Sequence, residues 1–69
     1  MIEWKRVDKN NPPEGTYLFI FDGRIYEGWT FEELDDDGYP MWQANEGPEC
    51  YEVRWYAEIN LPEPLDPNE

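Results

Sequence analysis

The chain has 69 residues, and 17 acidic side chains against five basic ones give it a net charge of -12. This length excludes a second domain, and an aromatic content of 17% argues against a disordered acidic segment, which is poor in such side chains. The single cysteine excludes an internal disulfide, and the N-terminal MIEWKRVDKN lacks the apolar core of a signal peptide, so we expect a soluble, cytoplasmic protein.

The first predicted element is a short strand or extended arm over residues 1–7, with Trp4 and Val7 pointing inward. A break at Pro12, Pro13 and Gly15 follows. The next stretch, TYLFIFDGRIYEGWTFEE, contains two β-rich runs separated by Asp22-Gly23, the pair that supplies the positive φ angles of a two-residue hairpin turn. The predicted partners across this hairpin are Phe21 with Arg24, Ile20 with Ile25, Phe19 with Tyr26 and Leu18 with Glu27.

Both faces of this hairpin are apolar, which leaves its inner side undecided. Because side chains alternate along a strand, one face carries Leu18, Ile20, Ile25, Trp29 and Phe31, and the other carries Tyr17, Phe19, Phe21 and Tyr26. Either both faces are covered or one of them is a binding surface.

The acidic stretch EELDDDGYP is the next predicted element, a loop in which one helical turn over residues 31–34 is an alternative. A short strand over residues 41–44 and a turn over residues 45–49 follow. The run CYEVRWYAEI alternates and predicts a last strand, with Tyr51, Val53, Trp55, Ala57 and Ile59 inward and Glu52, Arg54, Tyr56 and Glu58 outward.

Together these elements predict a mainly β fold, a small antiparallel meander of three to four strands. Residues 1–60 form its single domain, and residues 61–69 form an extended, Pro-rich acidic tail. Trp29, Val53, Trp55 and Ile59 are predicted to be buried, with Trp4 packed at one edge of the sheet.

The residue types needed for common catalysis are missing, so we expect no enzyme activity. The chain has no histidine and no serine, and it has no Gly-rich phosphate loop. Glu33, Asp35, Asp37 and Gly38 match the start of a calcium-binding EF-hand loop, but Ala44 stands where that loop needs a glutamate. We therefore predict no metal site and no cofactor.

The acidic run EELDDD has two interpretations, a solvated loop that aids solubility or part of a surface that mimics nucleic acid. A charge of -12 equals that of ~20 Å of duplex DNA, and a compact chain of this length is ~25 Å across, so the two charge densities are comparable. The residues predicted to bind a partner are Glu32, Glu33, Asp35, Asp36, Asp37, Glu46 and Glu49.

Mimicry predicts that these residues line one continuous edge, although the two loops that carry them can also lie at opposite ends of the sheet. Under mimicry, replacing Asp35, Asp36 and Asp37 by asparagine is expected to leave the fold intact and weaken partner binding.

Three pieces of the chain resemble a family of short tailed-phage and prophage proteins, domain of unknown function 551. They are Trp4-Lys5-Arg6-Val7, then Pro12-Pro13-Glu14-Gly15 leading into a strand, and Trp55 followed by Leu61-Pro62-Glu63-Pro64. The resemblance implies a phage or prophage origin and a small β-rich fold, and the family has no assigned activity to transfer.

The predicted function is therefore a phage-encoded inhibitor, of anti-CRISPR or anti-restriction type. It binds a basic nucleic-acid-binding protein of the bacterial host by acidic mimicry, and it binds neither nucleic acid nor membranes directly. The alternative is a protein-interaction adaptor that uses an exposed aromatic face, with the charge serving solubility.

Overall fold

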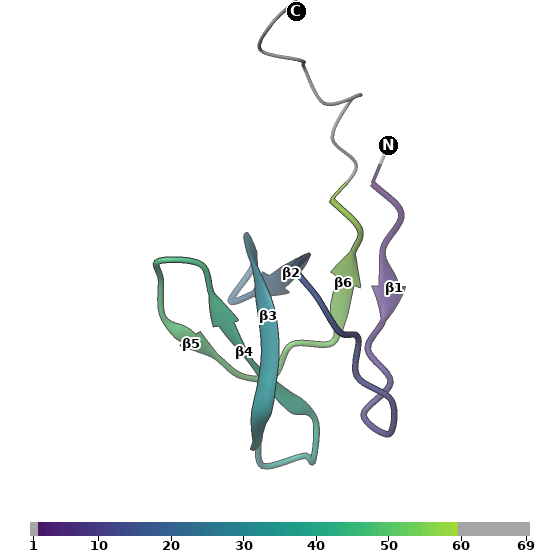
Figure 1. Cartoon of the computed structure of the whole chain (residues 1–69), viewed down its shortest axis with the longest axis vertical. Helices are drawn as coiled ribbons and strands as arrows, with labels where there is room; N and C mark the ends of the chain where they lie inside the picture. The colour runs from purple at the N-terminus through teal and green to yellow at the C-terminus, as the bar shows by residue number, and fades with distance from the viewer. Residues whose placement is uncertain (1, 60–69) are drawn as a thin grey trace, which may run out of the picture.

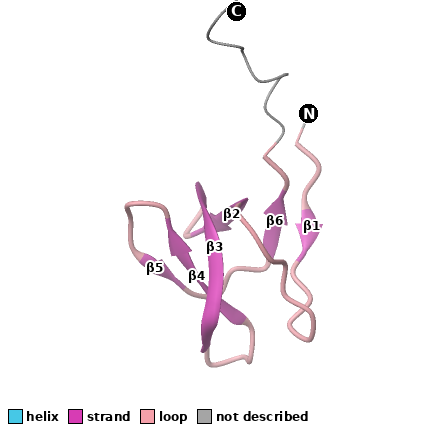
Figure 2. Ribbon diagram, in the orientation of Figure 1, coloured by secondary structure: helices cyan, strands magenta, loops and turns pink. Residues whose placement is uncertain are grey.

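The computed structural model describes residues 2–59, so the predicted Pro-rich tail lies outside the described residues. Every regular element within this range is a strand (Figures 1 and 2). None of the described residues belongs to a helix long and apolar enough to cross a membrane. The strands are β1 (Lys5–Arg6), β2 (Tyr17–Phe21), β3 (Arg24–Leu34), β4 (Pro40–Ala44), β5 (Glu49–Cys50) and β6 (Trp55–Ala57).

The strands form one sheet in the order β1-β6-β2-β3-β4-β5, and every neighbouring pair is antiparallel (Figure 1). The mainly β prediction is confirmed, with six strands in place of three or four. The two edge strands, β1 and β5, have only two residues each. Such short pairings leave little alternation for a sequence pattern to detect.

The predicted β2–β3 hairpin is confirmed together with its register. Phe21 pairs with Arg24, and the pairing continues to Tyr17 opposite Gly28. The turn has φ angles of 52° at Asp22 and 74° at Gly23. Positive φ at both positions matches the right-handed twist of the two strands, as the local sequence predicts.

Strand β3 runs farther than predicted, because the EEL part of the acidic stretch continues it to Leu34. Phe31 pairs with Met41 and Leu34 pairs with Pro40, with a register shift between these two pairs. The predicted loop is thus wrong for residues 32–34, and the alternative helical turn does not form. Pairing with β4 outweighs the low strand preference of the two glutamates.

The core lies on one face of the sheet and holds the aromatic side of the hairpin. Phe19, Trp42, Cys50 and Val53 are fully buried, and Val7 from the N-terminal arm joins them. The rings of Phe19 and Trp42 lie 4.8 Å apart. The half-buried side chains packed on this cluster are Tyr17, Phe21, Tyr26, Tyr39 and Tyr56.

The core prediction is confirmed for Val53 and wrong for two tryptophans. Trp29 is 39% exposed and Trp55 is 41% exposed, while Ile59 and Trp4 are half-buried. Trp29 lies on the Leu18 face of the hairpin, opposite the core, because Tyr26 and Gly28 occupy the inner positions of β3.

The predicted strand over residues 50–59 is wrong as a continuous element. Glu52 has a φ angle of 56°, which ends the extended backbone, so Cys50 and Val53 both face the core although they are three residues apart. The strand resumes only at Trp55, and there Tyr56 pairs with Phe19 on the core face. Trp55 points the other way, with the Arg6 guanidinium 5.3 Å from its ring centre, and Tyr51 is 53% exposed.

Candidate functional site

Negative charge gathers in the half of the sheet formed by β3, β4 and β5. Residues 25–53 contain no basic side chain, and Lys5 and Arg6 lie on β1 at the opposite edge. The other three basic residues lie at the borders of this half: Arg24 begins β3, while Lys9 and Arg54 reach in from neighbouring segments and lie against the Tyr39 ring. The acidic residues of the segment are Glu27, Glu32, Glu33, Asp35, Asp36, Asp37, Glu46, Glu49 and Glu52.

Asp35 is the organising residue of the turn between β3 and β4, and its side chain is 4% exposed. Its Oδ1 accepts hydrogen bonds from the backbone N–H groups of Asp37 at 2.9 Å and Tyr39 at 3.1 Å. Its Oδ2 accepts from the backbone N–H of Glu52 at 3.1 Å and from Nη1 of Arg54 at 3.2 Å. One carboxylate therefore ties this turn to the segment between β5 and β6.

These contacts set the ionisation of Asp35. Burial raises its pKa, but the hydrogen bonds from Tyr39, Asp37, Arg54 and Glu52 outweigh burial, and the pKa lies below its ordinary value of 3.8. The Asp35 carboxylate consequently stays charged at neutral pH and serves as a structural acceptor.

Arg54 neutralises part of the acidic run. Its Nη2 donates to Oδ2 of Asp37 at 2.8 Å, and its guanidinium stacks 3.7 Å from the centre of the Tyr39 ring. The expectation that replacing all three aspartates leaves the fold intact is therefore revised, because Asp35 and Asp37 support the turn.

The acids that remain available for a partner are a smaller set. Glu32, Glu33 and Asp36 are exposed, and within residues 2–59 their side chains make no hydrogen bond or ion pair with the protein. They lie along the end of β3 and in the turn that follows, so three unpaired charges are close in the chain. Glu46 and Glu49 are exposed and unpaired in the same way, so within residues 2–59 five of the seven predicted site residues are free for intermolecular contacts, three of them in this cluster.

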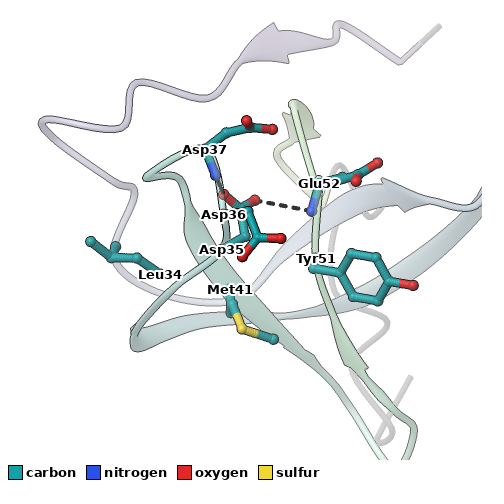
Figure 3. Close-up of a pocket in the computed structure, with 7 residues that line it drawn as sticks. All are labelled: Leu34, Asp35, Asp36, Asp37, Met41, Tyr51 and Glu52. Carbon is teal, nitrogen blue, oxygen red and sulfur yellow. Dashed lines mark hydrogen bonds between the residues drawn. The ribbon is translucent and has the colours of Figure 1, made fainter.

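A pocket of about 250 Å³ adjoins this turn. Figure 3 shows Tyr51 and Glu52 on one segment facing the Asp35 turn, with Met41 on the adjoining strand. This volume is below the roughly 300 Å³ at which drug-sized ligand pockets begin, so it suits a single side chain. The seven lining residues are Leu34, Asp35, Asp36, Asp37, Met41, Tyr51 and Glu52.

The pocket combines apolar walls with carboxylates. Leu34 is 61% exposed and Tyr51 is 53% exposed, so an entering group has apolar surface to cover. Lysine and arginine have an aliphatic stem and a charged head, and they stack on aromatic rings. The chemistry of the pocket therefore matches a basic side chain.

Glu46 and Glu49 lie apart from the aspartates. The turn that carries Glu46 joins β4 to β5, whereas the Asp35 turn joins β3 to β4, and the two turns lie at opposite ends of β4 (Figure 1). Five strand residues separate them, which is about 17 Å. Of the two arrangements considered from the sequence, the separated one is observed. The predicted continuous edge of all seven acids is therefore wrong, and a surface that mimics nucleic acid is limited to the acids at the end of β3 and in the turn that follows.

Sequence reasoning missed the other lining residues of the pocket. Met41 and Leu34 read as ordinary strand residues, and Tyr51 was predicted to point inward. The positive φ at Glu52 turns the chain here, and no local pattern predicts it because glutamate rarely adopts this conformation. Across residues 2–59, no group of three or more His, Cys, Asp or Glu side chains is arranged to hold a metal ion.

Comparison with known proteins finds no matching family model, no similar curated protein and no similar solved structure. The resemblance to the phage and prophage family thus stays a prediction from the three sequence pieces.

Proposed function

We propose that the protein is a phage-encoded inhibitor that occupies the basic, nucleic-acid-contacting surface of a bacterial defence or DNA-processing protein. The observation that carries the proposal is the charge segregation, with nine acidic and no basic side chains in residues 25–53. This segment includes most of β3 and all of β4 and β5.

The mechanism is competitive and needs no catalytic group. Carboxylates on a folded sheet present negative charge to a basic groove, and complementary charge accelerates encounter and favours this partner over neutral ones. Glu32, Glu33 and Asp36 take the place of backbone phosphates, while the pocket between Met41 and Tyr51 receives a lysine or arginine of the partner. Nucleic acid is then excluded from the groove.

The biological setting follows from the family resemblance. A phage or prophage protein acts in the cytoplasm of its bacterial host, where restriction enzymes and CRISPR complexes expose basic grooves for nucleic acid. We therefore propose an inhibitor of anti-CRISPR or anti-restriction type.

A second candidate function is a protein-interaction adaptor. The observation that favours it is the exposure of Ile25 and Trp29, on the hairpin face that does not join the core. The aromatic face of Tyr17, Phe19, Phe21 and Tyr26 packs in the core, so an adaptor would use the Ile25 face. Binding through that face alone predicts an affinity that salt hardly changes.

Affinity capture with two matched variants tests the proposal. A charge variant carries Glu32→Gln, Glu33→Gln and Asp36→Asn, and a control variant removes three charges elsewhere through Glu3→Gln, Glu14→Gln and Glu58→Gln. Immobilised wild type, charge variant and control variant are each exposed to nuclease-treated bacterial lysate at low salt, and bound proteins are eluted with DNA.

The expected result is a protein that binds wild type and the control variant, binds the charge variant less, and is released by DNA. If every retained protein binds all three baits equally, or resists release by nucleic acid, the mimicry proposal fails. A retained protein that resists DNA and tolerates high salt would support the adaptor.

A further inference from the structure

The sheet has a second apolar surface, opposite the core, which we call the outer face. Side chains alternate along each strand. Phe19, Tyr26 and Trp42 point into the core, so their neighbours in the strands point the other way. The larger apolar members of the outer face are Leu18, Ile20, Ile25, Trp29, Phe31, Met41 and Trp55.

The centre of the outer face is open within the described part of the chain. Ile25 is 55% exposed, Trp55 41% and Trp29 39%, whereas the other four members are half-buried. Exposed tryptophan on a rigid strand is a common anchor of protein interfaces, since it gives a large contact area at a small cost in side-chain entropy. Trp29 is held by its strand pairing with Gln43.

The charges on the outer face indicate what covers it. Around Trp29 these charges are acidic, because Glu27 lies between Ile25 and Trp29 on β3 and Glu49 pairs with Gln43, the partner of Trp29. The basic Arg6 lies at the far edge of this face, paired with Trp55. A second copy of the chain would bring these carboxylates against its own, and like charges at an interface oppose association. A partner surface with basic and aromatic groups is complementary to this face.

The outer face is continuous with the acidic pocket. Met41 pairs with Phe31 on the outer face and also lines the pocket beside Asp36. The carboxylates at the end of β3 and the exposed Trp29 thus belong to one surface, with acidic groups next to an aromatic ring.

We infer that the partner is a groove for single-stranded nucleic acid, in which Trp29 takes the place of a stacked base. This inference rests on the proposed function and names its partner class. Single-strand-binding grooves combine basic residues that follow the phosphates with aromatic side chains on which bases stack. Duplex-binding surfaces contact mainly phosphates and base edges and leave the base faces covered. An exposed indole beside carboxylates therefore mimics a single strand better than a duplex.

The test extends the affinity capture described above, in which proteins retained from bacterial lysate are eluted with DNA. Three further variants of the protein are immobilised as baits. Trp29→Ala removes the stacking ring, and Trp29→Leu keeps a large apolar side chain so that folding is secured. Trp55→Ala is the matched control, because Trp55 is exposed to a similar extent and lies on the same face, but on β6 beside Arg6, two strands away from Trp29 and the acidic turn. Circular dichroism confirms that each bait is folded, and elution compares a single-stranded oligonucleotide with a duplex of the same length.

We expect Trp29→Ala and Trp29→Leu to bind the DNA-released protein about 5- to 150-fold more weakly than wild type does, which is the range for loss of one base–aromatic stack. Trp55→Ala leaves the affinity unchanged, and the single-stranded oligonucleotide elutes at a lower concentration than the duplex.

Four other outcomes overturn the inference. Release by duplex alone, or equal binding by the Trp29 variants, refutes the single-strand groove and leaves the proposed function standing. Capture of no DNA-releasable protein by any bait refutes both. Sedimentation of wild type as a dimer that Trp29→Ala dissociates assigns the outer face to a second copy.

Discussion

Asp35→Asn tests whether a single carboxylate organises the acidic turn. The substitution preserves size and leaves one oxygen to accept the N–H groups of Asp37 and Tyr39. The new amide NH₂ then takes the place of Oδ2, which accepts from the backbone N–H of Glu52 and from Arg54. An NH₂ group is a donor and cannot accept these two hydrogen bonds. Two hydrogen bonds to a charged group are lost.

The magnitude follows from these contacts. Each hydrogen bond to a charged group contributes about 1.5 to 3 kcal/mol. Arg54 keeps its bond to Asp37 and the Glu52 N–H can bind water, so we expect the low end of the sum, about 3 kcal/mol. A domain of 69 residues has about 3 to 10 kcal/mol of stability in all, so the loss is large.

Urea unfolding followed by tryptophan fluorescence measures this loss, with Asp36→Asn as the control. Asp36 is the exposed neighbour, so its substitution should change stability by less than about 0.5 kcal/mol. The folded-state pKa of Asp35 is lowered. Its stabilisation is therefore complete above the ordinary value of 3.8 and is lost as the pH falls through the folded-state pKa.

The difference between wild type and Asp35→Asn should accordingly shrink in strong acid. Equal unfolding midpoints for the Asp35 and Asp36 variants, or a difference that does not change with pH, would refute the role assigned to Asp35.

Three further predictions concern the core and the sheet. Gly28→Ala should cost about 1 to 3 kcal/mol or prevent folding, because a Cβ there would lie 1.9 Å from the Gln43 carbonyl oxygen; an unchanged melting temperature would contradict this close approach. Trp55→Ala should cost less than the ~3 to 5 kcal/mol typical of a buried tryptophan, as urea unfolding can measure, since its side chain is 41% exposed. Cys50 should resist a thiol reagent in the folded protein and react on unfolding, because burial raises its pKa and hides the thiol; rapid labelling under native conditions would show that the site opens.

Local chemistry made the hairpin predictable. Asp22-Gly23 defines both the turn and the register, because few other pairs accept positive φ at both positions. The inner face was not predictable in the same way. Both faces of the hairpin are apolar, and the choice depends on Trp42, Val53 and Tyr56, which arrive from later segments.

The acidic composition of the site could be predicted from the sequence, but the arrangement of its side chains could not. The run EELDDD is obvious in the sequence, yet the role of Asp35 depends on Glu52 and Arg54, which lie 17 and 19 residues away. The alternation over residues 50–59 predicted a strand because it contains no turn residue at Glu52. The backbone bends there through a positive φ angle at Glu52, whose N–H donates to the Asp35 carboxylate.

The most direct test of the central claim is competition with DNA as a function of salt. A labelled oligonucleotide is bound to the protein released from the capture column, and wild type, charge variant and control variant are titrated as competitors between about 50 and 200 mM salt. We predict that wild type and the control variant displace the oligonucleotide completely, with an affinity that falls steeply as salt rises. The charge variant, lacking the carboxylates of Glu32, Glu33 and Asp36, should need a higher concentration and show a weaker salt dependence. Equal displacement by all three proteins, or a ternary complex that keeps the oligonucleotide bound, would contradict the claim that this acidic surface occupies a nucleic-acid groove.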